Sequence, residues 1–132
     1  MKVLTLSIKR EPFDQILAGA KKAERRILSP SSDGKMVEYV DAETGNTYRH
    51  LHDTPEGADV DINVIRYDAL KLCTGAYKGQ RPYIVVEVKD VEMQFLTDEN
   101  GDQIYYDGGD DHEYLAMALV YNLGNIIDKF NV

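Results

Sequence analysis

The chain has 132 residues, of which 43% are hydrophobic and 29% charged, and its formal net charge is −8. This length and composition are typical of one globular domain with a single core, here expected over 1–132. No apolar run approaches the roughly 20 residues of a membrane-spanning helix, and the acidic balance argues against broad coating of nucleic acid. Cys73 is the one cysteine, which excludes an internal disulfide, so we expect a reducing, cytoplasmic location.

The first third of the chain predicts a strand, a short helix and a second strand. The segment VLTLSI (3–8) alternates as a strand does and is not a signal peptide. Pro12 suits the first turn of a helix, and Gly19 suits the position just past its end. The segment KKAERRIL (21–28) has no helical apolar stripe and is expected to be a strand.

The rest of the chain predicts short strands joined by polar turns. The expected elements are two hairpins (35–52 and 93–107), a strand over 64–72, a strand over 82–96, a strand or helix over 114–123 and a final short helix over 124–132. Together these elements predict a mainly β fold of the α+β class. A small barrel-like domain with short flanking helices is the expected architecture.

Charge is distributed unevenly along the sequence. Residues 1–35 hold eight Lys or Arg and four Asp or Glu, a balance of +4, whereas the other 97 residues have a balance of −12. A local basic region on an acidic chain can still attract a phosphate group. One small anionic ligand or a short nucleic-acid strand is therefore compatible with the net charge.

Four residues in this basic region match a G-x-K-x-x-E-x-R motif: Gly19, Lys21, Glu24 and Arg26. With the strand and helix before the motif, the chain resembles the ASCH domain family of the PUA-like superfamily, in its bacterial or phage form. Two further stretches resemble family members, the segment over 67–93 and the segment MALVYNLGNII over 117–127. The resemblance covers about two thirds of the chain, and 29–62 looks like an insertion that carries its own hairpin.

The resemblance implies a PUA-like β-barrel with a cleft, lined by the motif, that accepts a nucleobase, a nucleoside or a short RNA. Some small bacterial members remove the acetyl group from N(4)-acetylcytidine without a metal. Lys21 matches the lysine implicated in those enzymes, whereas Glu24 stands where they have a threonine. The first hypothesis is therefore a module that binds RNA or a nucleotide, and the alternative is a metal-independent amidohydrolase.

Each motif residue has a chemical role that fits these hypotheses. Gly19 lets the backbone end the helix and approach a ligand. Lys21 and Arg26 can bind a phosphate, Lys21 as a point charge and Arg26 as a planar fork. Glu24 can accept a hydrogen bond from a base or, in an enzyme, act with Lys21 as the catalytic pair and activate water. The alternative interpretation is a surface strand with solvated charges, whose ion pair contributes about 0–1 kcal/mol.

Three residues outside the motif are further candidates for ligand binding. Tyr67 and Tyr77 offer rings on which a base can stack, a contact of about 1–3 kcal/mol. Arg81 lies in the same expected loop as Tyr77 and adds a guanidinium. With nine tyrosines and no tryptophan, most tyrosines are expected to be packing residues.

The sequence predicts no metal site and no cofactor. His50 and His52 share a strand face, but no thiolate or further histidine accompanies them, so two solvent-facing side chains are expected. The segment DENGD begins like a calcium loop but lacks the glycine and glutamate that such a loop requires. A third functional alternative is a protein-interaction domain that uses the hairpin over 35–52.

Overall fold

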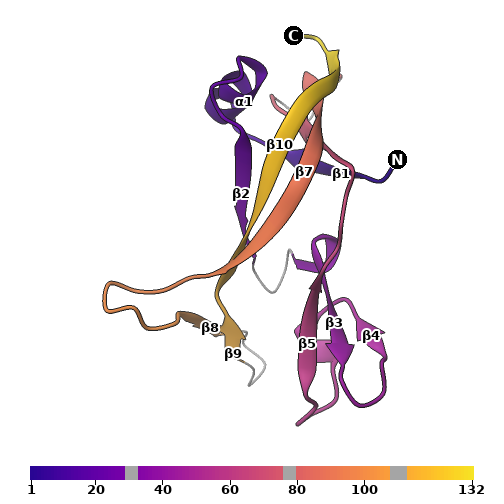
Figure 1. Ribbon diagram of the computed structural model, residues 1–132, viewed down its shortest axis with the longest axis vertical. Helices are drawn as coiled ribbons and strands as arrows, with labels where there is room; N and C mark the ends of the chain where they lie inside the picture. Colours follow the sequence, from indigo (N-terminus) through magenta and orange to yellow (C-terminus); the bar gives the residue numbers. More distant parts are fainter. Residues whose placement is uncertain (29–32, 76–79, 108–112) are drawn as a thin grey trace. The chain divides into compact units, whose positions relative to one another are not determined.

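The computed structural model describes residues 1–28, 33–75, 80–107 and 113–132, and it is mainly β (Figure 1). Among these residues there is one α-helix, and two short 3-10 turns accompany it. The elements are β1 (Val3–Ser7), α1 (Arg10–Leu17), β2 (Ala23–Ile27), η1 (Asp33–Lys35), β3 (Val37–Asp41), β4 (Thr47–Tyr48), η2 (Leu51–Asp53), β5 (Val60–Val64), β6 (Ala69–Cys73), β7 (Tyr83–Phe95), β8 (Tyr105–Asp107), β9 (Glu113–Leu115) and β10 (Met117–Phe130).

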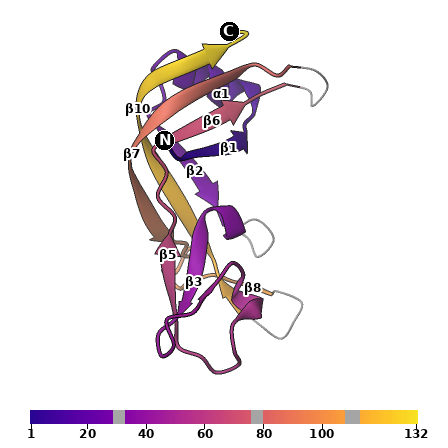
Figure 2. The ribbon, with the colours of Figure 1, turned by 90° about the vertical axis from the view of Figure 1, so that its right-hand side faces the viewer.

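The chain forms two compact units. The first unit comprises Met1–Arg25, Tyr67–Glu92 and Val120–Val132, and the second comprises Arg26–Arg66 and Met93–Leu119. A five-stranded sheet has the order β1-β6-β7-β10-β2, and its long strands β7 and β10 run side by side (Figures 1 and 2). Segments far apart in sequence therefore meet within the first unit.

The core of the first unit combines α1 with the strands around it. β1 pairs with β6 in parallel, and β6 pairs with β7 antiparallel. The helix buries two apolar side chains one turn apart, as its 3.6-residue period requires. The buried side chains of this unit include Leu4, Phe13, Ile16, Leu70, Leu72, Ile84, Val86, Tyr121 and Leu123.

The second unit contains a three-stranded antiparallel sheet in the order β4-β3-β5. Strand β3 alternates strictly, with Val37, Tyr39 and Asp41 buried. As expected for the first hairpin, β3 pairs with β4, and the turn between them includes Gly45 at a φ of 75°. The same unit also contains a separate antiparallel pair, β8 and β9.

One strand prediction was wrong because the pairing partners lie far away in sequence. The single strand expected over 64–72 is divided: β5 ends at Val64 and pairs with β3, whereas β6 begins at Ala69 and pairs with β1 and β7. The second expected hairpin does form around its turn: Asp98 N–H donates to the carbonyl of Asp102 at 2.8 Å, Ile104 N–H donates to the carbonyl of Leu96 at 3.1 Å, and Thr97 and Gln103 form an antiparallel bridge. Beyond this bridge, β8 pairs with β9.

The final short helix expected over 124–132 is also wrong, because β10 continues as a strand to Phe130. The sheet places β10 between β7 and β2, so its backbone groups find partners across the sheet. The ring of Phe130 stacks on Tyr83 of β7, with centroids 5.3 Å apart and planes 15° apart. The flanking helices of the expected architecture therefore reduce to α1 and the short 3-10 turns within the described ranges.

The mainly β class is confirmed, and the described residues form open sheets, not a closed barrel. β1 and β2 are the two edges of the five-stranded sheet. Cys73 is buried and its thiol is free. None of the helices in the described ranges is both long and apolar enough to cross a membrane.

Candidate functional site

The motif begins where α1 ends, at a turn that depends on Gly19. Its backbone N–H donates to the carbonyl of Ile16 at 3.1 Å, and its φ is 78°. This left-handed conformation is one that L side chains adopt at a cost of about 1–2 kcal/mol. The N–H groups of Ala20 and Lys21 then both donate to the carbonyl of Gln15, at 2.9 and 3.1 Å. The turn thus fixes the backbone that carries the motif lysine.

Lys21 and Glu24 form an ion pair within the first unit. Lys21 Nζ lies 4.0 Å from Glu24 Oε2, and the side chains are 35% and 8% exposed, respectively. A carboxylate this buried requires a positive or hydrogen-bonding neighbour. The ammonium of Lys21 is one such neighbour, and it retains access to solvent.

The start of β2 is attached to β10 immediately beside this pair. The backbone N–H of Leu123 donates to the carbonyl of Lys22 at 2.9 Å. The next residue of β10 is Gly124, and there is little room for a side chain at this position. A Cβ on residue 124 would lie 3.1 Å from Cβ of Glu87 on β7. The motif, β7 and β10 are therefore in close proximity.

A pocket of about 350 Å³ lies between these segments of the first unit. It is lined by the end of α1 and the turn after it, by two positions of β7 and by four consecutive residues of β10. Three lysines, several apolar side chains and no Asp or Glu are among its lining residues. The lining residues are Ile16, Leu17, Ala18, Gly19, Lys21, Lys22, Val86, Lys89, Leu123, Gly124, Asn125 and Ile126.

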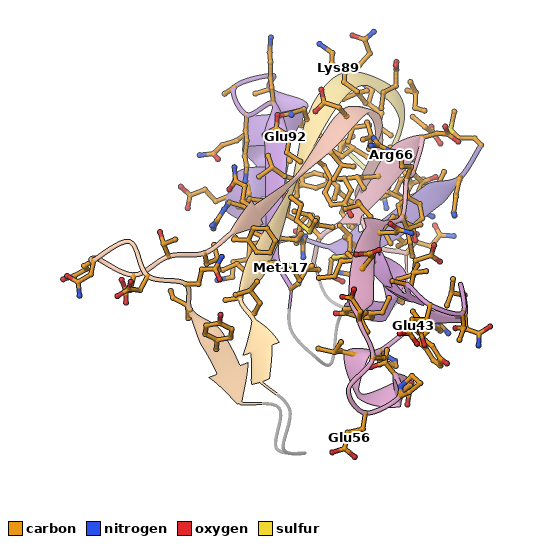
Figure 3. The ribbon with its side chains drawn as sticks, turned by 60° about the horizontal axis from the view of Figure 1, so that its bottom comes forward. Glu43, Glu56, Arg66, Lys89, Glu92 and Met117 are labelled. Atoms are coloured by element: carbon orange, nitrogen blue, oxygen red, sulfur yellow. The ribbon has the colours of Figure 1, made fainter. Side chains whose placement is uncertain are left out.

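The unit that contains the lysine-lined pocket is positively charged, whereas the other unit is negatively charged. The first unit has eleven Lys or Arg and eight Asp or Glu, a net charge of +3, whereas the second has four and fifteen, a net charge of −11. Exposed Glu43 and Glu56 of the second unit are labelled in Figure 3. Six of the eight basic residues noted in 1–35 thus belong to the unit that also carries the pocket.

The structure brings together only part of the predicted site. Gly19 and Lys21 line the pocket, and Glu24 lies against Lys21. Arg26 belongs to the second unit. Tyr77 lies outside the described residues.

Tyr67 and Arg81 lie at opposite ends of β6, and neither is among the pocket's lining residues. The ammonium of Lys2 lies over the Tyr67 ring, 5.3 Å from its centroid. Arg81 donates from Nη1 to Ser7 Oγ at 3.2 Å and from Nη2 to the carbonyl of Cys73 at 3.3 Å. These contacts support the ends of β1 and β6, which is a structural role.

Two charged pocket residues, Lys22 and Lys89, were not among the predicted site residues. Lys22 is adjacent to a motif position, so proximity in sequence was a usable signal. Lys89 on β7, labelled in Figure 3, carries no such signal, because it reaches the pocket only through the order of strands in the sheet.

No family model, curated protein or solved structure matches this chain. Within the described part of the chain, no group of three or more His, Cys, Asp or Glu is placed to hold a metal ion. The functional argument therefore depends on the lysine-lined pocket and on the motif residues beside it.

Proposed function

We propose that this chain is a nucleotide-binding module that holds a nucleotide, either free or as one unit of a short RNA, in the lysine-lined pocket. The lysines that line the pocket are the main support for this proposal. Lys21 of the motif lines a pocket of about 350 Å³ together with Lys22 and Lys89, in the positively charged unit. Small-molecule pockets start at about 300 Å³, so this one suits a ligand of about one nucleotide.

The lining of the pocket matches the two halves of a nucleotide. Ile16, Leu17, Val86 and Leu123 provide apolar surface for a base or sugar. The ammonium groups provide donors for a phosphate, to which lysine binds as a point charge. Gly19 adds backbone without a side chain, which allows a ligand to approach closely.

The assignment of the chain to the ASCH family, within the PUA-like superfamily, is part of the same proposal. The order β1, α1, β2, with the motif beginning at the turn after α1 and ending within β2, supports it. The resemblance places a nucleobase or RNA ligand at that motif. Phosphate contacts from Arg26 and stacking by Tyr77 remain hypotheses within the proposal.

The proposal predicts saturable binding of nucleotides that weakens with salt. Isothermal titration of the full chain with cytidine and adenosine monophosphates, and fluorescence titration with a labelled six-nucleotide RNA, would measure it. We expect affinity to fall severalfold between about 50 and 200 mM salt, because exposed charges are screened beyond about 10 Å at 0.1 M. Absence of measurable binding to any of these ligands at low salt would remove the proposal.

The Lys21–Glu24 pair favours one second candidate, the metal-independent hydrolysis of an acylated nucleoside. With the atoms 4.0 Å apart, Lys21 can polarise an amide carbonyl while Glu24 accepts a proton from water. If this is the activity, absorbance will show turnover of N(4)-acetylcytidine, and Glu24→Gln will reduce it by about 10²–10⁴-fold. Lack of turnover, or turnover that persists in Glu24→Gln, would exclude this chemistry.

A further inference from the structure

We infer that the pocket takes a free mononucleotide and that Lys22 and Lys89 hold its terminal phosphate. This inference rests on the nucleotide-binding function proposed above and makes it more specific. It assigns a recognition role to two residues outside the four-residue motif. It also separates a phosphomonoester ligand from an RNA strand.

The three pocket lysines differ in their surroundings. Lys21 is paired with Glu24 and 35% exposed. Lys22 and Lys89 are exposed, and in the ranges that the structure describes neither forms an ion pair. Their ammonium groups can therefore bind an anion without first breaking an ion pair, whereas the charge of Lys21 is already partly balanced by Glu24.

The two exposed lysines come from different segments of the first unit. Lys22 follows the turn after α1, and Lys89 lies on β7, yet both line the same pocket. Their positions are held by the sheet, through the bond from Leu123 to the carbonyl of Lys22 and through the place of β7 next to β10. Two separately anchored ammonium groups can bind different oxygens of one phosphate.

The charges nearby favour a strongly charged phosphate. Glu24 lies against Lys21, and Glu87 lies beside Gly124, with Oε2 3.6 Å from the position a Cβ there would take. These carboxylates reduce the positive potential around the lysines. An internal phosphodiester, which has one negative charge, is therefore attracted only weakly. A terminal phosphate carries a charge of about −1.5 to −2 at pH 7, and its Coulomb attraction is proportionally larger.

The net negative charge of the whole chain also favours a mononucleotide over an RNA strand. The chain carries a net charge of −8. A polyanionic strand is repelled by such a protein over distances of about a Debye length, roughly 10 Å at 0.1 M salt. A mononucleotide has its charge in one place, next to the lysines, and avoids most of this repulsion.

The test compares four probes by isothermal titration with the full chain in low salt. The probes are cytidine, cytidine 5′-monophosphate, inorganic phosphate and a six-nucleotide RNA with hydroxyl groups at both ends. We expect the monophosphate to bind at least tenfold more tightly than cytidine, phosphate or the RNA. If the base contributes nothing, phosphate alone will bind equally well, and the inference of a nucleotide ligand is overturned.

Substitutions of single lysines then test which side chains bind the phosphate. Lys22→Ala and Lys89→Ala should each weaken monophosphate binding about tenfold while leaving weak cytidine binding unchanged, and exposed Lys129→Ala on β10, outside the pocket, should have no effect. Equal loss in all three variants, or no loss in the first two, overturns the assignment. RNA that binds as tightly as the monophosphate overturns the inference but supports the proposed function, whereas failure of every probe removes both.

Discussion

Phe13→Ala should lower the free energy of unfolding by about 3–5 kcal/mol, the usual cost of removing a fully buried aromatic ring. The Phe13 side chain is 0% exposed and lies on the buried face of α1. This helix has only eight residues, too few to be stable without packing. We therefore expect loss of the ring to release α1 from the core of the first unit.

Urea denaturation followed by circular dichroism measures this loss of stability. The free energy to compare comes from the transition in which the first unit unfolds. Gln15→Ala is the matched control, because Gln15 is an exposed residue of the same helix and alanine favours helix. The control should change stability by less than about 0.5 kcal/mol. A loss below about 1 kcal/mol for Phe13→Ala would contradict the role of α1 as part of the core.

The same substitution links stability to the proposed site. The last turn of α1 and the turn after it supply Ile16, Leu17, Ala18 and Gly19 to the pocket. Release of α1 therefore dismantles one wall of the pocket even where the sheet persists. Nucleotide affinity should fall in Phe13→Ala at temperatures where the chain is still largely folded.

The second large effect is expected from charge reversal at the motif lysine. Lys21→Glu should weaken nucleotide binding at least about 30-fold, which corresponds to about 2 kcal/mol, within the range for a hydrogen bond to a charged group. The substitution removes an ammonium from the pocket. It also places a second carboxylate beside Glu24, where the two atoms of the present ion pair are 4.0 Å apart.

Lys129→Glu is the matched control for this charge change. Lys129 is exposed on β10 of the same unit and does not line the pocket. It should alter affinity by less than about threefold, through long-range and salt-dependent effects only. Similar losses in both variants would show that net charge, and not the pocket, governs binding.

Repulsion between two neighbouring carboxylates can also destabilise the turn, so Lys21→Ala accompanies the reversal. It removes the ammonium without adding a negative charge. We expect about a tenfold loss of affinity with little change in the denaturation midpoint, because Lys21 is partly exposed. If Lys21→Ala binds as the unmodified chain does, the motif lysine is not part of the ligand site.

Local patterns in the sequence determined the elements around the motif. Strand alternation, the proline near the start of α1 and Gly19 after its end predicted β1, α1 and β2, because these signals act between residues a few positions apart. The match to the G-x-K-x-x-E-x-R motif singled out Lys21 and Glu24, which the structure places in an ion pair.

The tertiary structure alone decided which distant residues join the pocket and which do not. The hydrogen-bond partner of a strand can lie anywhere along the chain, so no local pattern could bring Lys89 of β7 to Lys21, or place Tyr67 and Arg81 at opposite ends of β6. For the same reason β10 extends through the segment where a helix was expected. Residue spacing determines local conformation, whereas strand order and register, which depend on pairing across the whole chain, determine the site.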